Sequence, residues 1–214
     1  MDMLILVPVL LLSFVAHEFA HAWVALQQGD RTAWDLGRVT LNPIPHIDLW
    51  GTILIPAMLI ASGSGYLIGW AKPVPVVAAN FRNYRRGDIL VSFAGVAANL
   101  LLAVACTLLM IGLTHLGRGL PGSDWTRPVA RLLEAGISLN FLLVVFNLLP
   151  IPPLDGSRLV YHILPAAARA LYRRFERYGI LVFLLLMLTG AFSIVLRPAG
   201  ALVRLSWKLI EWST

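Results

Sequence analysis

The chain alternates between long apolar runs and short polar segments rich in turn-forming residues. Apolar runs cover residues 3–27, 49–64, 88–114, 132–150 and 179–196. A helix needs about 20 apolar residues to cross a hydrocarbon layer about 30 Å thick, and most of these runs approach that length. The run at 49–64 is short, which leaves open a crossing helix or a re-entrant element. The pattern predicts an all-α polytopic membrane protein, a bundle of about five to six transmembrane or re-entrant helices.

Two polar segments and the tail predict smaller elements. Apolar positions alternate around Gly37 within 31–41, and a second extended piece is expected at 66–77. Both patterns favour short membrane-associated β-strands on the cytosolic side of the bundle. The tail, 197–214, predicts a helix lying in the membrane interface, because its large apolar side chains share one face: Leu202, Leu205, Leu209 and Trp212.

Composition supports the membrane assignment. Hydrophobic residues make up 58% of the chain and charged residues 13%, whereas a soluble domain carries about 25% charged residues. We expect one membrane domain over residues 1–214, with a catalytic core at about 3–160 and a membrane helix and an interfacial helix in 161–214. The only cysteine, Cys106, excludes an internal disulfide. No nucleic-acid motif accompanies the net charge of +6, so we expect lipid and not nucleic acid as a partner.

Charge predicts the orientation in a cell membrane that the chain crosses several times. Most of the 17 basic residues share one side if the first run passes from outside to inside. The positive-inside rule makes that side cytosolic and leaves the N-terminus outside. The residues on the predicted cytosolic side are Arg31, Arg38, Lys72, Arg82, Arg85, Arg86, Arg158, Arg169, Arg173, Arg174 and Arg177.

The first apolar run contains the sequence His-Glu-Phe-Ala-His at residues 17–21. Two histidines four residues apart lie on one face of a helix and can bind a single zinc ion, with the glutamate beside the open metal position. One alternative is that His17, Glu18 and His21 are satisfied by neighbours in a helical core. Their setting argues against it, because each ionisable group costs about 2.5 kcal/mol or more in the membrane. The motif predicts a metallopeptidase that works within a membrane.

Zinc in a hydrolase takes three protein ligands and a water, so a third ligand must come from elsewhere. Asp155 follows the fourth apolar run, which a proline cluster beginning at Pro150 ends. From Met3 to His17 a helix rises about 21 Å, and from Glu134 to Pro150 it rises about 22 Å in the same direction. The histidines and Asp155 are therefore expected at similar depth. An ordinary Asp-Gly turn at a helix exit is the alternative for Asp155.

The end of the fourth apolar run resembles the signature of a known protein family. Residues 147–156, Asn-Leu-Leu-Pro-Ile-Pro-Pro-Leu-Asp-Gly, resemble the N-x-x-P-x-P-x-x-D-G signature of the site-2 protease family, and they follow H-E-F-A-H in the expected order. Stretches at 42–52, 69–75 and 94–99 are also similar to compact prokaryotic members. The likeness covers 13 to about 160, and the chain leaves no room for a PDZ or CBS domain.

The resemblance implies an intramembrane zinc metalloendopeptidase with one Zn²⁺ per chain. His17, His21 and Asp155 would be the zinc ligands and Glu18 the catalytic acid and base. Asn147 would assist near the reacting carbonyl, although a helix–helix hydrogen bond is nearly as good an interpretation. The substrate would be a transmembrane protein, held by strand addition at 31–41 or 66–77. Ordinary strands that only seal the cytosolic mouth are the alternative for these two segments. We interpret Asn99 and Asn140 as helix–helix hydrogen-bonding contacts, and His46 and His162 as interfacial or structural groups.

Two other functions compete with a peptidase. A zinc or proton-coupled transporter would hold metal near the midplane, but it would need ligands spaced along a pore, and the carboxylates do not follow the spans. A relative that binds membrane helices without cutting them would not need Glu18. Both alternatives remain open at the level of sequence.

Overall fold

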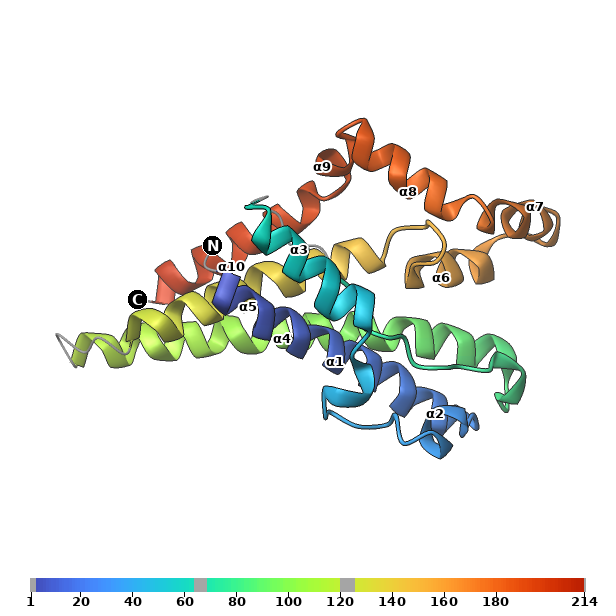
Figure 1. The fold of residues 1–214 in the computed structure, drawn as a ribbon, viewed down its shortest axis with the longest axis horizontal. Coiled ribbons are helices and arrows are strands. Elements are labelled where there is room, and N and C mark those ends of the chain that lie inside the picture. The colour runs from blue at the N-terminus through green and yellow to red at the C-terminus, as the bar shows by residue number, and fades with distance from the viewer. Residues whose placement is uncertain (1–2, 64–68, 120–125, 214) are drawn as a thin grey trace.

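The computed structural model describes residues 3–63, 69–119 and 126–213, and all the regular elements in these ranges are helical (Figure 1). Three long helices form the centre: α1 (Met3–Gln28), α4 (Tyr84–Gly119) and α5 (Thr126–Asn147). They run side by side and pack against one another in all three pairings. Within them, the segments Ile5–Gln28, Tyr84–Leu116 and Thr126–Asn147 are long and apolar enough to cross a membrane.

Shorter helices surround this centre and connect it. Between α1 and α4 lie α2 (Thr32–Asp35), η1 (Ile44–His46), η2 (Leu49–Leu54), α3 (Ile55–Ala61) and η3 (Ala78–Asn80). After α5 come α6 (Asp155–Ile163), α7 (Ala166–Glu176), α8 (Gly179–Leu188), α9 (Ala191–Val195) and α10 (Arg197–Ser213). Among these, α6 packs against α4, and α10 returns along α5 and α4.

The largest buried cluster lies where α4, α5 and α10 meet. Ala103 of α4 and Ile137 of α5 are both 0% exposed, and Ile210 of α10 packs into the same cluster. The helix predicted at 197–214 is therefore present, with one face against the bundle. Leu205, Leu209 and Trp212, on the face predicted to meet the membrane interface, stay exposed.

The predicted number of five to six membrane helices is not confirmed in the described residues. Three helices meet the length and composition needed, and the run at 49–64 forms the shorter apolar helix Leu49–Ala61. The run at 179–196 is interrupted at Gly190, whose φ of 71° ends α8 and starts α9. A left-handed residue cannot continue a helix, so the run is divided into two short pieces.

The predicted β-strands are wrong for the part of the chain that the structure describes. The 31–41 segment forms α2 and then a left-handed turn at Gly37, with φ 65°. Residues 69–77 form no regular element, and 66–68 lie outside the described residues. Pro73 and Pro75 lack N–H donors, and Arg38 bonds the carbonyls of Lys72 and Pro73. A regular strand needs free N–H and carbonyl groups along its length, and at Lys72, Pro73 and Pro75 one or both of these groups are absent or already bonded.

Candidate metal centre

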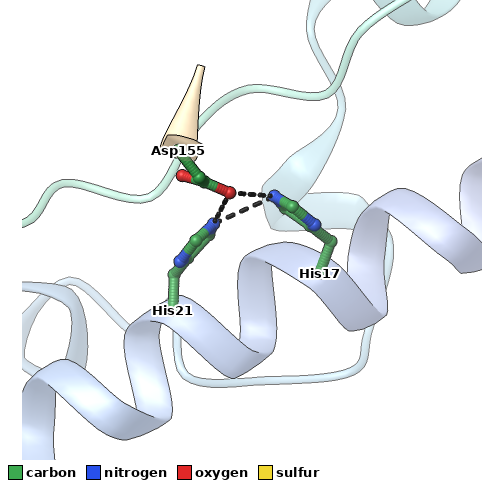
Figure 2. A group of neighbouring side chains, drawn as sticks. All are labelled: His17, His21 and Asp155. Atoms are coloured by element: carbon green, nitrogen blue, oxygen red, sulfur yellow. Dashed lines mark hydrogen bonds and ion pairs between the residues drawn. The ribbon is translucent and has the colours of Figure 1, made fainter. Parts of the chain in front are cut away.

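His17 and His21 bring their side chains to one point because they lie on the same face of α1. Their Nε2 atoms are 2.9 Å apart. Figure 2 shows the two rings rising from α1, with the Asp155 carboxylate approaching from the other side. Asp155 Oδ2 lies 3.3 Å from each Nε2. Among the described residues this is the one group of three His, Cys, Asp or Glu side chains close enough to share an ion.

The second nitrogen of each ring is already engaged. His21 Nδ1 lies 2.7 Å from the Val91 carbonyl oxygen, and His17 Nδ1 lies 2.7 Å from Asn99 Oδ1. Carbonyl oxygens only accept hydrogen bonds, so each Nδ1 carries the proton and donates. Each Nε2 is then left with a lone pair. This is the arrangement of metal-binding histidines, whose outer N–H is held by an oxygen acceptor.

These lone pairs fit a divalent cation. Two unprotonated nitrogens facing each other at 2.9 Å, beside a carboxylate, repel unless a positive charge lies between them. Asp155 Oδ2 is buried and receives no hydrogen bond from the described residues. Zinc bonds of about 2.0–2.1 Å at tetrahedral angles place ligand atoms about 3.3 Å apart, the distance found between Asp155 Oδ2 and both rings. The residues present therefore fit zinc.

Gly95 of α4 leaves room for the two imidazoles. A Cβ at this position would lie 2.5 Å from His21 Nε2 and 2.6 Å from His17 Nε2. Any side chain would therefore occupy the space between the ligand atoms. The close approach of α4 to the rings requires a glycine here.

Asp155 is held in place by contacts made farther along α6. Asp88 of α4 is 6% exposed in its side chain and bonds His162 Nε2 at 2.7 Å and Arg158 at 3.0 Å. Both partners belong to α6, which begins at Asp155. Gly156 allows α6 to begin against the Leu148 carbonyl, where a Cβ would overlap it. These contacts fix the first turn of α6 and hence the carboxylate.

Glu18 faces the same cavity, which has a volume of about 340 Å³ and is also lined by His17, His21 and Asp155. The Val74 N–H donates to Glu18 Oε2 at 2.7 Å. Arg38, which is 8% exposed, donates to the Lys72 carbonyl at 2.8 Å and the Pro73 carbonyl at 3.0 Å. The glutamate is therefore held by a backbone segment that a buried arginine fixes.

Asp30 fixes the other end of that segment. Its carboxylate accepts hydrogen bonds from the Val77 N–H at 2.7 Å, from Asn80 Nδ2 at 2.9 Å and from Thr32. Burial by itself raises the pKa of Asp30, but the hydrogen bonds from Thr32, Asn80 and Val77 outweigh it and lower the pKa below 3.8. The segment 72–77 thus has a charged anchor at each end.

Comparisons with known proteins agree with this geometry. Residues 110–190 match peptidase family M50. A Bacillus subtilis (strain 168) protein named "Putative zinc metalloprotease YwhC" is 42% identical over 193 residues, covering 90% of this chain and 84% of the relative. The chain belongs to peptidase family M50, the site-2 protease family.

More distant relatives carry the same kind of name. A Mycolicibacterium smegmatis protein named "Putative zinc metalloprotease Rip2" is 36% identical over 188 residues, or 86% of this chain and 66% of the relative. Its Mycobacterium tuberculosis (strain H37Rv) namesake is 34% identical over 182 residues, with 83% and 63% covered. No solved structure matches the chain. As an M50 member, it is an intramembrane metalloprotease by family.

The remaining candidate residues of this M50 chain divide into two groups. Asn147 lines the cavity beside Glu18, and its Nδ2 donates to the Leu143 carbonyl at 3.0 Å. His46 and His162 are both buried, which favours the structural one of the two predicted alternatives: His46 bonds the Thr40 carbonyl, and His162 bonds Asp88.

Asn99 and Asn140 make the helix–helix hydrogen bond that the sequence predicts, since Asn99 of α4 donates to Asn140 of α5. The sequence does not reveal that Asn99 also bonds His17. The signal in the sequence is an amide side chain inside an apolar run, because a polar group without a partner is unfavourable within the membrane.

Proposed function

We propose that this chain is a zinc metalloendopeptidase that hydrolyses peptide bonds within or near transmembrane segments of other proteins. The observation that carries the proposal is the convergence of His17 and His21 Nε2 with Asp155 Oδ2 around one point, beside Glu18. When bound, zinc supplies a Lewis acid and an activated water. In this proposal each chain holds one zinc ion through these three side chains.

Glu18 is the acid and base of the proposed reaction. Its carboxylate takes a proton as water attacks and later passes it to the departing amine. The bond from the Val74 N–H holds one of its oxygens and leaves the other free for proton transfer. Asn147 lines the same cavity, and its amide is the donor we propose for the developing oxyanion.

We propose that the substrate is a transmembrane protein whose cleaved segment is unwound and pairs with the backbone of residues 74–77. The Val74 N–H faces Glu18, and Val77 has an extended backbone. Groups two residues apart in an extended chain face the same side. The Val76 N–H, which bonds no described residue, and the Val74 and Val76 carbonyls would therefore be available for strand addition beside the zinc ligands.

We also propose a multi-pass cell membrane location, with the N-terminus outside and the active site toward the cytosol. The start of α4 and helices α6 and α7 meet at one end of the bundle: Arg85 bonds the His162 carbonyl, Arg158 pairs with Asp88, and Arg173 of α7 bonds the Tyr161 hydroxyl. The basic residues of these segments therefore share one side, which the positive-inside rule makes cytosolic.

The test uses purified protein and a transmembrane substrate whose helix carries a destabilising residue. Glu18→Gln keeps the shape of the side chain and removes the base, so it should retain zinc and lower the cleavage rate by at least about 100-fold. Glu134→Gln, at an exposed position of α5, is the matched control and should cleave normally. Cleavage at the wild-type rate by Glu18→Gln would exclude the proposed base.

A further inference from the structure

A chain of buried amides runs from His17 through all three long helices. His17 Nδ1 lies 2.7 Å from Asn99 Oδ1, and Asn99 Nδ2 lies 2.9 Å from Asn140 Oδ1. Asn140 Nδ2 in turn lies 2.9 Å from the Gly136 carbonyl. Asn99 is 0% exposed and Asn140 is 2% exposed. His17 belongs to α1, Asn99 to α4 and Asn140 to α5.

The direction of these hydrogen bonds is fixed from the far end. The Gly136 carbonyl can only accept, so the NH₂ group of Asn140 must face it, and Asn140 Oδ1 must face Asn99. Asn99 Nδ2 then donates to Asn140 Oδ1 and, at 3.3 Å, to the Ser13 carbonyl. Its Oδ1 is left to face His17, so His17 Nδ1 carries the proton and Nε2 has the free lone pair.

His21 is held in the same tautomer by a single hydrogen bond. Its Nδ1 donates to the backbone carbonyl of Val91. A backbone carbonyl is present whatever the side chain at that position. His17 has no such backbone acceptor among the described residues and depends on an amide side chain that could turn around. Asn140 prevents that rotation, because a turned Asn99 would point its NH₂ group at His17 Nδ1 and its oxygen at Asn140 Oδ1.

We infer that Asn99 and Asn140 are positioning residues that hold His17 in the tautomer and orientation needed to bind zinc, with Asn140 acting through Asn99. This inference rests on the zinc site of the proposed function. It concerns metal affinity, so it can be tested on protein that is not cleaving. A chain that binds zinc tightly but cuts nothing would end the proposed function and leave this inference intact.

The experiment measures the zinc affinity of purified, metal-depleted protein in detergent by competition with a chelator of known affinity. Asn99→Leu removes the acceptor of the His17 N–H and should weaken zinc binding by about 10- to 100-fold. Asn140→Leu does not touch His17 and should weaken it by about 10-fold. Co²⁺ loading provides a second signal, because a displaced His17 changes the visible absorption of a tetrahedral site.

Two further variants separate positioning from packing. Asn99→Asp keeps an oxygen acceptor for His17 Nδ1 and should bind zinc more tightly than Asn99→Leu. Thr107→Val removes another buried hydrogen bond of α4, from Thr107 to the Ala103 carbonyl, away from the site. It should leave zinc affinity unchanged even if it lowers the melting temperature.

Folded Asn99→Leu and Asn140→Leu proteins that bind zinc within twofold of the wild type would overturn the inference. Should the leucine variants not fold, Asn99→Ser and Asn140→Ser replace them with the same expectations, because serine is too short to bridge either gap. Equal losses in Thr107→Val would also overturn it, since they would reveal a general effect of core damage.

Discussion

The Val74 N–H donates to Glu18 Oε2 at 2.7 Å, and this bond joins the proposed base to a segment 56 residues away in the sequence. The segment has little regular structure of its own. Its position depends on Arg38 at one end and Asp30 at the other. The conformation of Glu18 therefore depends on two charged residues that do not touch it.

Replacing Arg38 by methionine should reduce both stability and activity. Methionine keeps the apolar stem but loses the donors to the Lys72 and Pro73 carbonyls. Lost hydrogen bonds to a charged group should lower the free energy of unfolding by about 2 kcal/mol. The cleavage rate should fall because Val74 is no longer held against Glu18.

Arg31→Met is the matched control for this change. The Arg31 side chain is 69% exposed and lies 3.8 Å from Asp35, so its loss should change stability by less than about 0.5 kcal/mol. Equal effects of the two substitutions, measured by denaturant unfolding in micelles, would contradict the role given to Arg38.

Gly95→Ala should abolish metal binding in a chain that still folds. The added Cβ would lie 2.5 Å from His21 Nε2 and would displace the rings from each other. Gly112→Ala, on the same helix, meets nothing within 4 Å and should instead stabilise α4 by about 0.5–1 kcal/mol. Metal analysis of the two purified variants makes the comparison, and normal zinc content in Gly95→Ala would contradict the site geometry.

Asp88→Asn should destabilise the attachment of α6 to α4. Asp88 accepts hydrogen bonds from both His162 and Arg158, and the loss of hydrogen bonds to a charged group costs about 1.5–3 kcal/mol. Because Asp155 begins α6, zinc affinity should fall together with stability. Asp35→Asn, at an exposed position, is the control for the same chemical change. An unchanged melting temperature in Asp88→Asn would be inconsistent with this anchor.

The lowered pKa of Asp30 predicts that part of the folding stability is lost in acid. Its pKa is lowered in the folded chain, so its contribution is fully present above the unfolded value of about 3.8 and is lost as pH falls through the lower folded value. The stability gap between wild type and Asp30→Asn should stay constant from pH 7 to about pH 5 and shrink below pH 4. Unfolding curves of both proteins at several pH values test this. A stability difference between the two proteins that grows on acidification would contradict the prediction.

The sequence predicts the convergence of His17, His21 and Asp155 because each of them has a local signal. His17 and His21 are four residues apart, and Asp155 follows a helix that prolines end at matching depth. The strands failed because alternation does not reveal whether a partner strand exists, and Pro73 and Pro75 remove the donors that one would need. The bond between Val74 and Glu18 involves only a backbone N–H, so no residue type could reveal it.

Residues that support the site were harder to recognise than the ligands. Asn99 is 82 residues from His17, and its contact depends on how α1 and α4 pack. A polar residue in an apolar run shows that a partner is needed but not which one. The predicted number of membrane helices is not confirmed in the described residues. One reason is local, since the break at Gly190 requires a left-handed conformation that a hydropathy profile does not detect.

The most direct test of the account is the zinc content of purified wild-type and Asp155→Ala protein. The account predicts one zinc ion per wild-type chain and, in folded Asp155→Ala, a loss of most of that zinc under the same dialysis. Equal zinc content in the two proteins would show that Asp155 does not bind the metal, and it would contradict the site built from His17, His21 and Asp155.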